Sequence, residues 1–290
     1  MRFWGVYQLA HPAPALQPYI ENYWFVSHGP GEEVELRVDV FVDARADLIF
    51  NFEAPYVREV IGGKSRQIAE STLDLQRLVP IRIHQQGFVR IVGVRFRLGG
   101  LAPFARDDLK RWNGGTPAPT LVLGDAVAEL EDRLRNEEDT AGCTTMLDAF
   151  FLERLERGGS TAAFERALAV LVDSEGQATT EVIAASATMT PRQVQRLFAR
   201  HLGYSPRTVA RVIRFQKALR SLMVDPRVSL GDIAADAHYY DQAHLVREFR
   251  AFTGGVPRGY RGYYPVSGPD DFAPNVVAYV QDDTIDRRAG

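Results

Sequence analysis

Two kinds of hydrophobic periodicity divide the chain into a first and a second half. Between residues 19 and 96, apolar side chains alternate with polar ones or form short apolar runs, which is typical of β-strands. From about residue 125 to residue 260, apolar side chains recur every three or four positions, which is typical of amphipathic helices. The pattern therefore predicts a strand-rich first half followed by a helical second half.

The clearest strand signal lies at Glu33–Val42, where Val or Leu occupies every second position and charged residues stand between most of them. We expect one face of this strand to be buried and the other exposed. Further strands are expected at 19–26, 47–52, 56–61 and 90–96. Short strands at this spacing predict a small antiparallel β-barrel or sandwich. Helices expected at 125–136 and 144–157 make the N-terminal domain α+β.

Two stretches of the second half, residues 181–198 and 230–249, follow one plan. Each begins with a short helix that carries Ile-Ala, and a turn and a second helix follow. The second helices start at polar residues that can cap them, Thr190 and Asp241. Their inward positions are Val194, Leu197, Phe198 and His201 in the first unit and Leu245, Phe249 and Phe252 in the second. The repeat predicts an all-α domain with two helix-turn-helix units.

The second helix of each unit presents arginine, glutamine and histidine on its other face. These residues are Arg192, Gln195, Arg196 and Arg200, then Gln242, His244, Arg247 and Arg250. Arg and Gln can hydrogen-bond to base edges or phosphates in a major groove. Ordinary amphipathic helices with solvated arginines are the alternative, but two copies in this arrangement favour binding of double-stranded DNA.

The helix expected between the two units, at about 207–222, carries arginines at i, i+4 and i+7. Arg207, Arg211 and Arg214 could follow the phosphate backbone, and a solvated helix face explains the same spacing equally well. The net charge of −3 argues against nucleic acid, but its distribution does not. Residues 160–265 hold 14 Lys/Arg and 9 Asp/Glu, a net charge of +5, so the rest of the chain carries −8. A basic module on an acidic chain favours DNA.

These residues resemble the AraC/XylS family of transcription regulators. The match is carried by 232–234, 239–244, 247–250, 252–254, Pro257 and 260–261, and in the first unit by 196–198 and 202–206. The resemblance implies two recognition helices in successive major grooves, with Arg192, Gln195, Arg196, Gln242, His244 and Arg247 facing the bases. The family usually has Gly in each turn, where this chain has Thr188 and His238. Either these turns are built differently, or the strain of a left-handed non-glycine residue makes this domain less stable than its relatives.

The first half resembles an uncharacterised N-terminal domain that is often fused to such modules. The match is carried by 46–50, 92–97 and 99–104, and it names no ligand. The usual Pro-Asp-Gly is replaced here by Val42-Asp43-Ala44, so we expect a different loop at this place. We expect a sensing or assembly domain at 1–157, a hinge at 158–160, the DNA-binding domain at 161–265 and a tail at 266–290. The β-prone segment 275–280 of the tail is expected to add a strand or to lie loose.

Candidates for other chemistry are weak. Gly62-Gly63-Lys64-Ser65 resembles the end of a phosphate-binding loop but lacks its first glycine and its context. The six histidines are scattered and include no His-x-His pair, so we expect no metal. Cys143 begins a predicted helix and could form a reactive thiolate, although a packed apolar role is favoured. No nucleophile–base pair is present at a familiar spacing, so neither an enzyme nor a cofactor is expected.

The sequence predicts a sequence-specific transcription regulator whose N-terminal domain senses a small effector or dimerises. A homodimer would use the apolar helix 144–157, which carries Met146, Leu147, Phe150, Phe151 and Leu155, or its neighbour at 125–136, whereas packing of both helices on the barrel would leave a monomer. The competing functions are an enzyme or ligand-carrier barrel with a helical appendage, and an N-terminal domain that serves assembly alone. No apolar run is long enough for a membrane span, and the single cysteine is compatible with the cytoplasm. The operator, the effector and the choice between activation and repression stay open.

Overall fold

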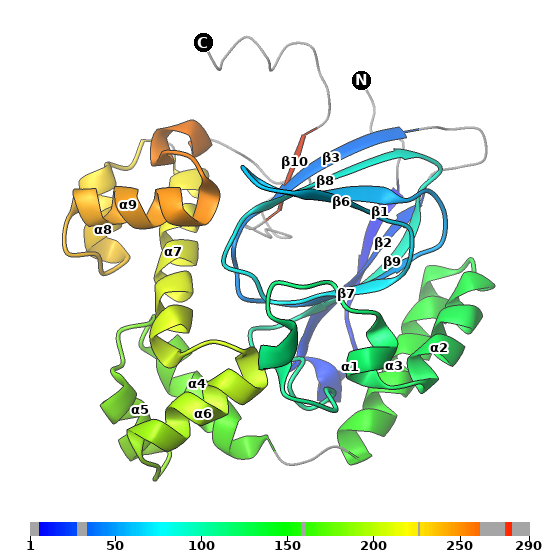
Figure 1. The fold of residues 1–290 in the computed structure, drawn as a ribbon, viewed down its shortest axis with the longest axis horizontal. Coiled ribbons are helices and arrows are strands. Elements are labelled where there is room, and N and C mark those ends of the chain that lie inside the picture. Colours follow the sequence, from blue (N-terminus) through cyan, green and yellow to red (C-terminus); the bar gives the residue numbers. More distant parts are fainter. Residues whose placement is uncertain (1–5, 28–33, 158–160, 226, 262–275, 280–290) are drawn as a thin grey trace.

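The computed structural model describes residues 6–27, 34–157, 161–225, 227–261 and 276–279 (Figure 1). Its first part is a β-sandwich with helices on one side, and its second part is helical, as the hydrophobic pattern predicts. The expected hinge at 158–160 and most of the tail lie outside the described residues. The domain boundaries therefore stay a prediction.

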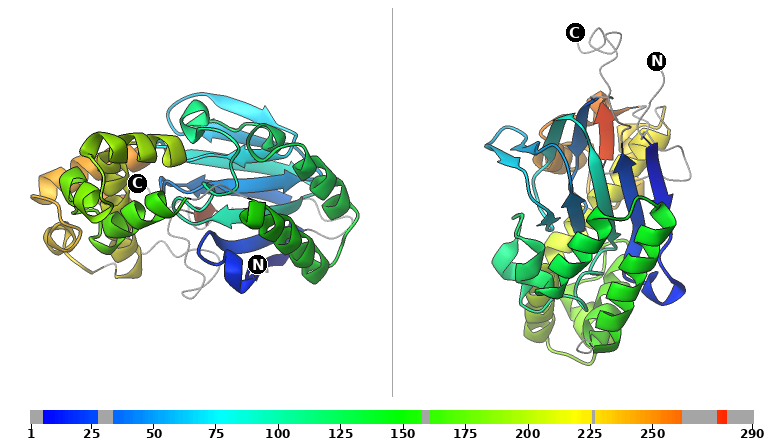
Figure 2. Two further views of the ribbon diagram at one scale, coloured as in Figure 1. Left: turned by 90° about the horizontal axis from the view of Figure 1, so that it is seen from below. Right: turned by 90° about the vertical axis from the view of Figure 1, so that its right-hand side faces the viewer.

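Two antiparallel sheets form the sandwich (Figures 1 and 2). Within the described residues, the first sheet has the order β1 (Val6–Ala10), β2 (Ile20–Ser27), β9 (Arg90–Phe96), β4 (Asp47–Asn51) and β7 (Thr72–Asp74). The second has the order β10 (Val276–Tyr279), β3 (Val34–Val40), β8 (Ile81–Gly87), β5 (Tyr56–Val60) and β6 (Ser65–Ile68). Strand β10 pairs with β3, with Val277 opposite Asp39, so the tail does add a strand.

The sequence pattern located five of these strands but misjudged one face of β3. Asp39, expected on an exposed face, is 6% exposed and binds the Arg82 guanidinium through both carboxylate oxygens, at 2.6 and 2.9 Å. Val40, expected on the buried face, is only half-buried. The alternation fails at Asp39 because this side chain is covered within the protein, where an ion pair with Arg82 replaces water, whereas Arg37 on the same face is exposed.

Three helices cover the first sheet: α1 (Pro119–Leu123), α2 (Ala126–Arg135) and α3 (Thr140–Arg157). Their apolar side chains pack into one core with β4 and β9. On α3, Leu147 and Phe151 are fully buried and Phe150 is 8% exposed, while Met146 and Leu155 pack partly buried against the same core. The apolar face of α3 is therefore used within the monomer, so it does not support a homodimer, which stays a prediction.

Two other sequence candidates have structural roles. Cys143 is buried in α3, and this burial together with nearby Glu137 raises the pKa of its thiol, which opposes thiolate formation. Gly62 and Gly63 form the turn of the β5–β6 hairpin, where Gly62 has a φ of 78°. Among the residues that the structure describes, no three or more His, Cys, Asp or Glu side chains gather as a metal site would require. No helix in the described part is long and apolar enough to cross a membrane.

The helical domain consists of α4 (Ala162–Asp173), α5 (Thr180–Ser186), α6 (Pro191–Leu202), α7 (Pro206–Val224), α8 (Leu230–Asp236) and α9 (Gln242–Thr253), with a short η3 (Pro257–Tyr260). Helices α5 and α6 form the first helix-turn-helix unit, and α8 and α9 form the second. The long helix α7 joins them, as expected (Figure 1). Both predicted units are confirmed.

The N-terminal domain reaches into the cores of both units. The loop of residues 41–44, here called the interdomain loop, places Phe41, Val42 and Ala44 among buried residues of α7, α8 and α9, and each of the three is at most 1% exposed. The ring of Phe41 also packs edge-on against Tyr260, with 5.1 Å between ring centres. Ala102 is buried against the first unit in the same manner. Each helical unit therefore has a core that the N-terminal domain completes.

The interdomain loop was expected to differ because Ala44 replaces a glycine. The structure instead gives Ala44 a φ of 55°, the left-handed conformation that glycine favours. The Asp43 carboxylate accepts the backbone N–H of Arg45 at 3.2 Å, which closes the turn. Burial of Ala44 on the helical domain opposes the strain of this conformation, so the backbone conformation typical of glycine is kept without a glycine.

We predict that Phe41→Ala lowers the free energy of unfolding by about 3–5 kcal/mol, because it empties a fully packed site between the domains. Urea unfolding followed by far-UV circular dichroism measures the loss. The control is Phe88→Ala in the same domain, where the ring is 45% exposed, and we expect its effect to stay within about 0.5 kcal/mol. Equal losses for the two variants would contradict the shared core.

Candidate nucleic-acid interface

The first recognition helix, α6, begins at a complete capping box. Thr190 Oγ1 accepts the backbone N–H of Gln193 at 3.3 Å, and Gln193 Oε1 accepts the backbone N–H of Thr190 at 2.7 Å. Pro191 follows at the first helical position, where its missing N–H leaves no helical bond unmade. The predicted cap is confirmed, and it fixes where the exposed face of α6 begins.

The two faces of α6 divide as the sequence predicts. Val194 and Phe198 are fully buried, and Leu197 and His201 are half-buried. The His201 ring stacks on Phe164, with 4.8 Å between ring centres, and burial lowers its pKa. The exposed face carries all of the candidate contact residues of this helix, namely Arg192, Gln195, Arg196 and Arg200.

The second recognition helix, α9, repeats this construction. Asp241 accepts the backbone N–H of His244 at 2.6 Å, and Leu245 and Phe249 are each 1% exposed. The exposed candidates are Gln242, Arg247 and Arg250. His244 is half-buried, and its ring meets the edge of Tyr239 at 5.2 Å between ring centres. Part of the His244 ring therefore packs within the second unit, and the rest is accessible.

Both turns have the left-handed backbone that the resemblance implies. Thr188 has a φ of 54° and His238 a φ of 58°, so neither turn is rebuilt around its non-glycine residue. His238 has a partner, because its Nε2 lies 3.0 Å from a carboxylate oxygen of Glu175 in the loop between α4 and α5. The same carboxylate receives the Lys217 ammonium of α7 at 2.7 Å, and these partners lower the pKa of Glu175. This polar cluster links the α4–α5 loop, α7 and the turn of the second unit.

The arginine stripe of α7 does not form a row that is free for phosphates. Arg211 makes a two-bond ion pair with Glu248 of α9, with distances of 2.8 and 2.9 Å. Arg214 donates to the carbonyl of Gly176 at 2.8 Å. Only Arg207 of the three is exposed. Arg211 and Arg214 therefore fasten α7 to its neighbours, a role that the spacing of the arginines did not reveal.

A groove beside α6 was not predicted. It encloses about 520 Å³ and is lined by Asp108, Lys110, Met189, Gln193, Arg196, Leu197, Ala199 and Arg200. Asp108 and Lys110 belong to the N-terminal domain, at the short η2 (Leu109–Trp112), which packs against α6. This contact could not be predicted from the hydrophobic pattern, because η2 and α6 are about eighty residues apart. The N-terminal domain thus borders the first recognition helix.

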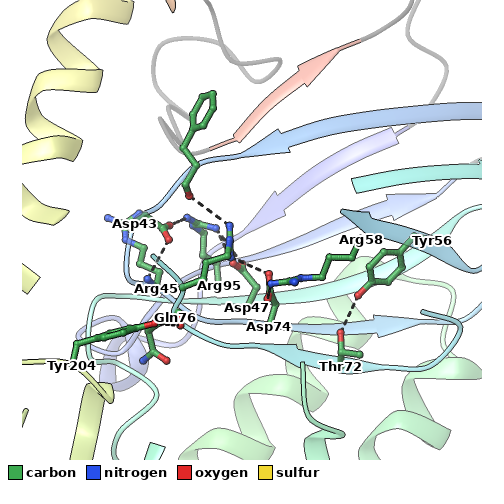
Figure 3. Close-up of polar contacts among 12 residues, drawn as sticks. Asp43, Arg45, Asp47, Tyr56, Arg58, Thr72, Asp74, Gln76, Arg95 and Tyr204 are labelled. Atoms are coloured by element: carbon green, nitrogen blue, oxygen red, sulfur yellow. Dashed lines mark hydrogen bonds and ion pairs between the residues drawn. The ribbon is translucent and has the colours of Figure 1, made fainter. Parts of the chain in front are cut away.

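A network of buried charges underlies the contact between the domains (Figure 3). Arg95, which is 5% exposed, binds Asp47 through Nη1 at 3.0 and 3.2 Å and Asp43 through Nη2. Burial raises the pKa of Asp47 although Arg95 opposes the shift. Tyr204, just after α6, donates its hydroxyl to the carbonyl of Gln76 at 3.0 Å. The network therefore holds the interdomain loop, while Tyr204 bonds the first unit to the same domain.

Comparisons with known families agree with this architecture. Residues 183–263 match the family described as "Helix-turn-helix domain", and residues 8–116 match "Domain of unknown function (DUF6597)". None of the curated proteins compared with the chain matches it significantly. The class that fold and site define is a helix-turn-helix DNA-binding protein with a β-rich N-terminal domain. Residues 183–263 therefore form an AraC-type helix-turn-helix domain, and the chain is a DNA-binding transcription regulator.

Solved structures give weak similarities over most of the chain. ToxT from Vibrio cholerae, solved at 1.65 Å, is 10% identical with a TM-score of 0.44, over 79% of this chain and 97% of that one. ToxT from strain SCE256 bound to an unsaturated fatty acid is 12% identical with a TM-score of 0.42, over 80% and 96%. The AraC-like transcriptional activator CuxR is 10% identical with a TM-score of 0.25, over 67% and 80%.

We predict that Thr188→Gly raises the free energy of unfolding by up to about 1 kcal/mol, because an exposed β-branched residue at positive φ is strained. His238→Gly gains less, because it also loses the contact with Glu175. The matched control is Ala185→Gly on the exposed side of α5, which loses about 1 kcal/mol in an ordinary helical conformation. Thermal unfolding followed by circular dichroism compares the three, and a lower melting temperature for Thr188→Gly would contradict the strain.

Proposed function

We propose that a single chain covers two adjacent major-groove segments, with α6 in one and α9 in the next. The observation that carries the proposal is the repeated geometry: each helix has a side-chain cap, a buried apolar face and an exposed face of Arg and Gln. Such a face can hold base edges and phosphates together. Because both helices lie on one chain, the target site needs no palindrome.

Helix α7 sets the spacing of the two recognition helices. Its 19 residues span about 28 Å at about 1.5 Å per residue. This is shorter than the groove repeat of roughly 34 Å. Each unit extends beyond its end of α7, so modest bending of the DNA brings both helices into their grooves. The Arg211–Glu248 pair and the Glu175–Lys217 pair support a fixed spacing, because they hold α7 to the second unit and to the loop that precedes α5.

The proposed contacts differ in kind. Arg192, Gln195 and Arg196 of α6 face the bases of the first half-site, and Gln242, His244 and Arg247 of α9 face those of the second. Arg200, Arg207 and Arg250 are exposed cations at the margins and contact phosphates. Arg211 acts indirectly, because its ion pair with Glu248 orients the helix that carries Arg247.

The N-terminal domain senses a small polar effector in this proposal. Support comes from polar side chains that lie between the two sheets and bond across them. Gln85 Nε2 bonds Asn51 Oδ1 at 3.3 Å and Tyr56 bonds Thr72 at 3.0 Å, so polar groups bridge the sheets. The buried Oε1 of Gln85 and Nε of Arg77 have no hydrogen-bond partner. Such groups could be satisfied by a polar ligand, and the regulator would act where the DNA is, in the cytoplasm.

The experiment that tests DNA recognition is selection of the preferred duplex from a random pool by the full-length chain. We expect one site with two distinct half-sites about one helical turn apart. Recovery of random sequences would contradict sequence-specific binding. Recovery of a single short half-site would mean that only one helix specifies sequence.

We predict that Arg196→Ala or Arg247→Ala costs about 1–3 kcal/mol on the selected duplex and relaxes preference within one half-site, a different one for each variant. The reason is that each arginine holds a base edge in its own groove. Titrations with duplexes changed in one half-site at a time measure the loss. The matched control is Lys64→Ala, an exposed cation at the β5–β6 turn, which leaves binding unchanged. Equal losses on cognate and random DNA would make the arginines phosphate contacts.

We predict that inserting five base pairs between the half-sites removes most of the specific affinity. Half a helical turn moves one half-site to the opposite side of the duplex, which α7 cannot reach. An insertion of ten base pairs serves as the comparison. It returns both half-sites to the same side of the duplex but leaves them one helical turn further apart. Gel-shift titration of the three duplexes measures the effect, and undiminished affinity for the five-base-pair insertion would contradict the two-groove arrangement.

A further inference from the structure

The short helix η2 presents cations beside the first recognition helix. Its first turn is fixed by Asp108, whose carboxylate accepts the backbone N–H of Lys110 at 2.9 Å. Leu109 is 1% exposed and anchors η2 in the core of the N-terminal domain. Lys110 and Arg111 are exposed. A buried leucine thus holds two cations at the surface.

Hydrogen bonds hold η2 next to α6. The Asn113 side chain donates to the carbonyl of Gly203, the C-cap residue of α6, at 2.5 Å. The next residue, Tyr204, donates its hydroxyl to the carbonyl of Gln76. The position of η2 relative to α6 is therefore set by bonds at the end of the helix, and Lys110 is fixed beside the face that carries Arg196 and Arg200.

The groove between η2 and α6 has a positive charge. It contains Lys110, Arg196 and Arg200 but only one carboxylate, that of Asp108. Among the described residues, no ion pair joins Asp108 to any of these three cations. A major groove is about 12 Å wide, so phosphates lie close to a helix that enters it. A cation that shares a groove with two exposed arginines of α6 is therefore near the path of one DNA strand.

We propose that Lys110 is a DNA-phosphate contact supplied by the N-terminal domain, next to the half-site that α6 occupies. This inference rests on the proposed function. Lys110 adds affinity without sequence preference, because phosphate contacts carry no base information. Asp108 weakens the same contact, since its carboxylate repels the strand that Lys110 attracts. The β-rich domain is then part of the DNA-binding surface as well as a neighbour of it.

Two substitutions of opposite sign test the inference in the full-length chain. Lys110→Gln is expected to weaken binding about three- to tenfold at moderate salt and to reduce the slope of log affinity against log salt by about 0.9. The loss is equal on cognate and random duplexes. Asp108→Asn keeps a good capping residue but removes the charge, and it is expected to strengthen binding about two- to fivefold. Lys64→Gln is the control for a remote exposed lysine and changes neither quantity.

The outcomes separate this inference from the proposed function. If the parent protein binds its selected duplex and Arg196→Ala weakens it, but Lys110→Gln and Asp108→Asn change neither affinity nor salt slope, the inference is wrong. Stronger binding by Lys110→Gln would also overturn it, because η2 would then obstruct DNA. If the parent protein binds no duplex selectively, the proposed function itself fails. Unchanged melting temperatures of both variants show that folding does not account for a change in binding.

Discussion

The position of the two domains depends on the buried guanidinium of Arg95. A buried charge without partners costs several kcal/mol, so Arg95 must keep the carboxylates of Asp43 and Asp47 within reach. Asp43 belongs to the interdomain loop, and holding it over Arg95 directs the neighbouring Phe41 and Val42 into the second helix-turn-helix unit. The ion pairs that Arg95 needs inside the β-sandwich therefore also position the apolar side chains that pack between the domains.

The parts of the fold that depend on neighbouring residues could be predicted from the sequence. Thr190 and Asp241 cap helices within their own first turn, so both recognition helices were located correctly. Strands β6 and β7 could not be located, because β6 has a single buried residue and β7 is three residues long. Such strands are defined by their pairing with distant strands. The left-handed φ of Ala44 was missed for the same reason, since contacts across the domain interface stabilise it.

The candidate site shows the same division between local and distant effects. Exposed faces follow from helical spacing, and the arginines of α6 and α9 lie where the pattern indicates. Spacing cannot reveal which exposed-looking arginine already has a partner: Arg211 binds Glu248, 37 positions later in the chain. Nor can it reveal that η2 borders α6. Both features depend on how the domains pack, and both change which residues are available to a ligand.

The pairing of β10 with β3 brings the chain back to the N-terminal domain after the helical domain. After α9 and η3 the polypeptide returns to the sheet of the N-terminal domain, so the helical domain is covalently attached to the sandwich on both of its sides. In topological terms the DNA-binding domain is an insertion rather than an appendage. A single proteolytic cut between α3 and α4 would leave both fragments associated through β10. After a second cut before residue 276, only the cores shared with the N-terminal domain would hold the helical domain.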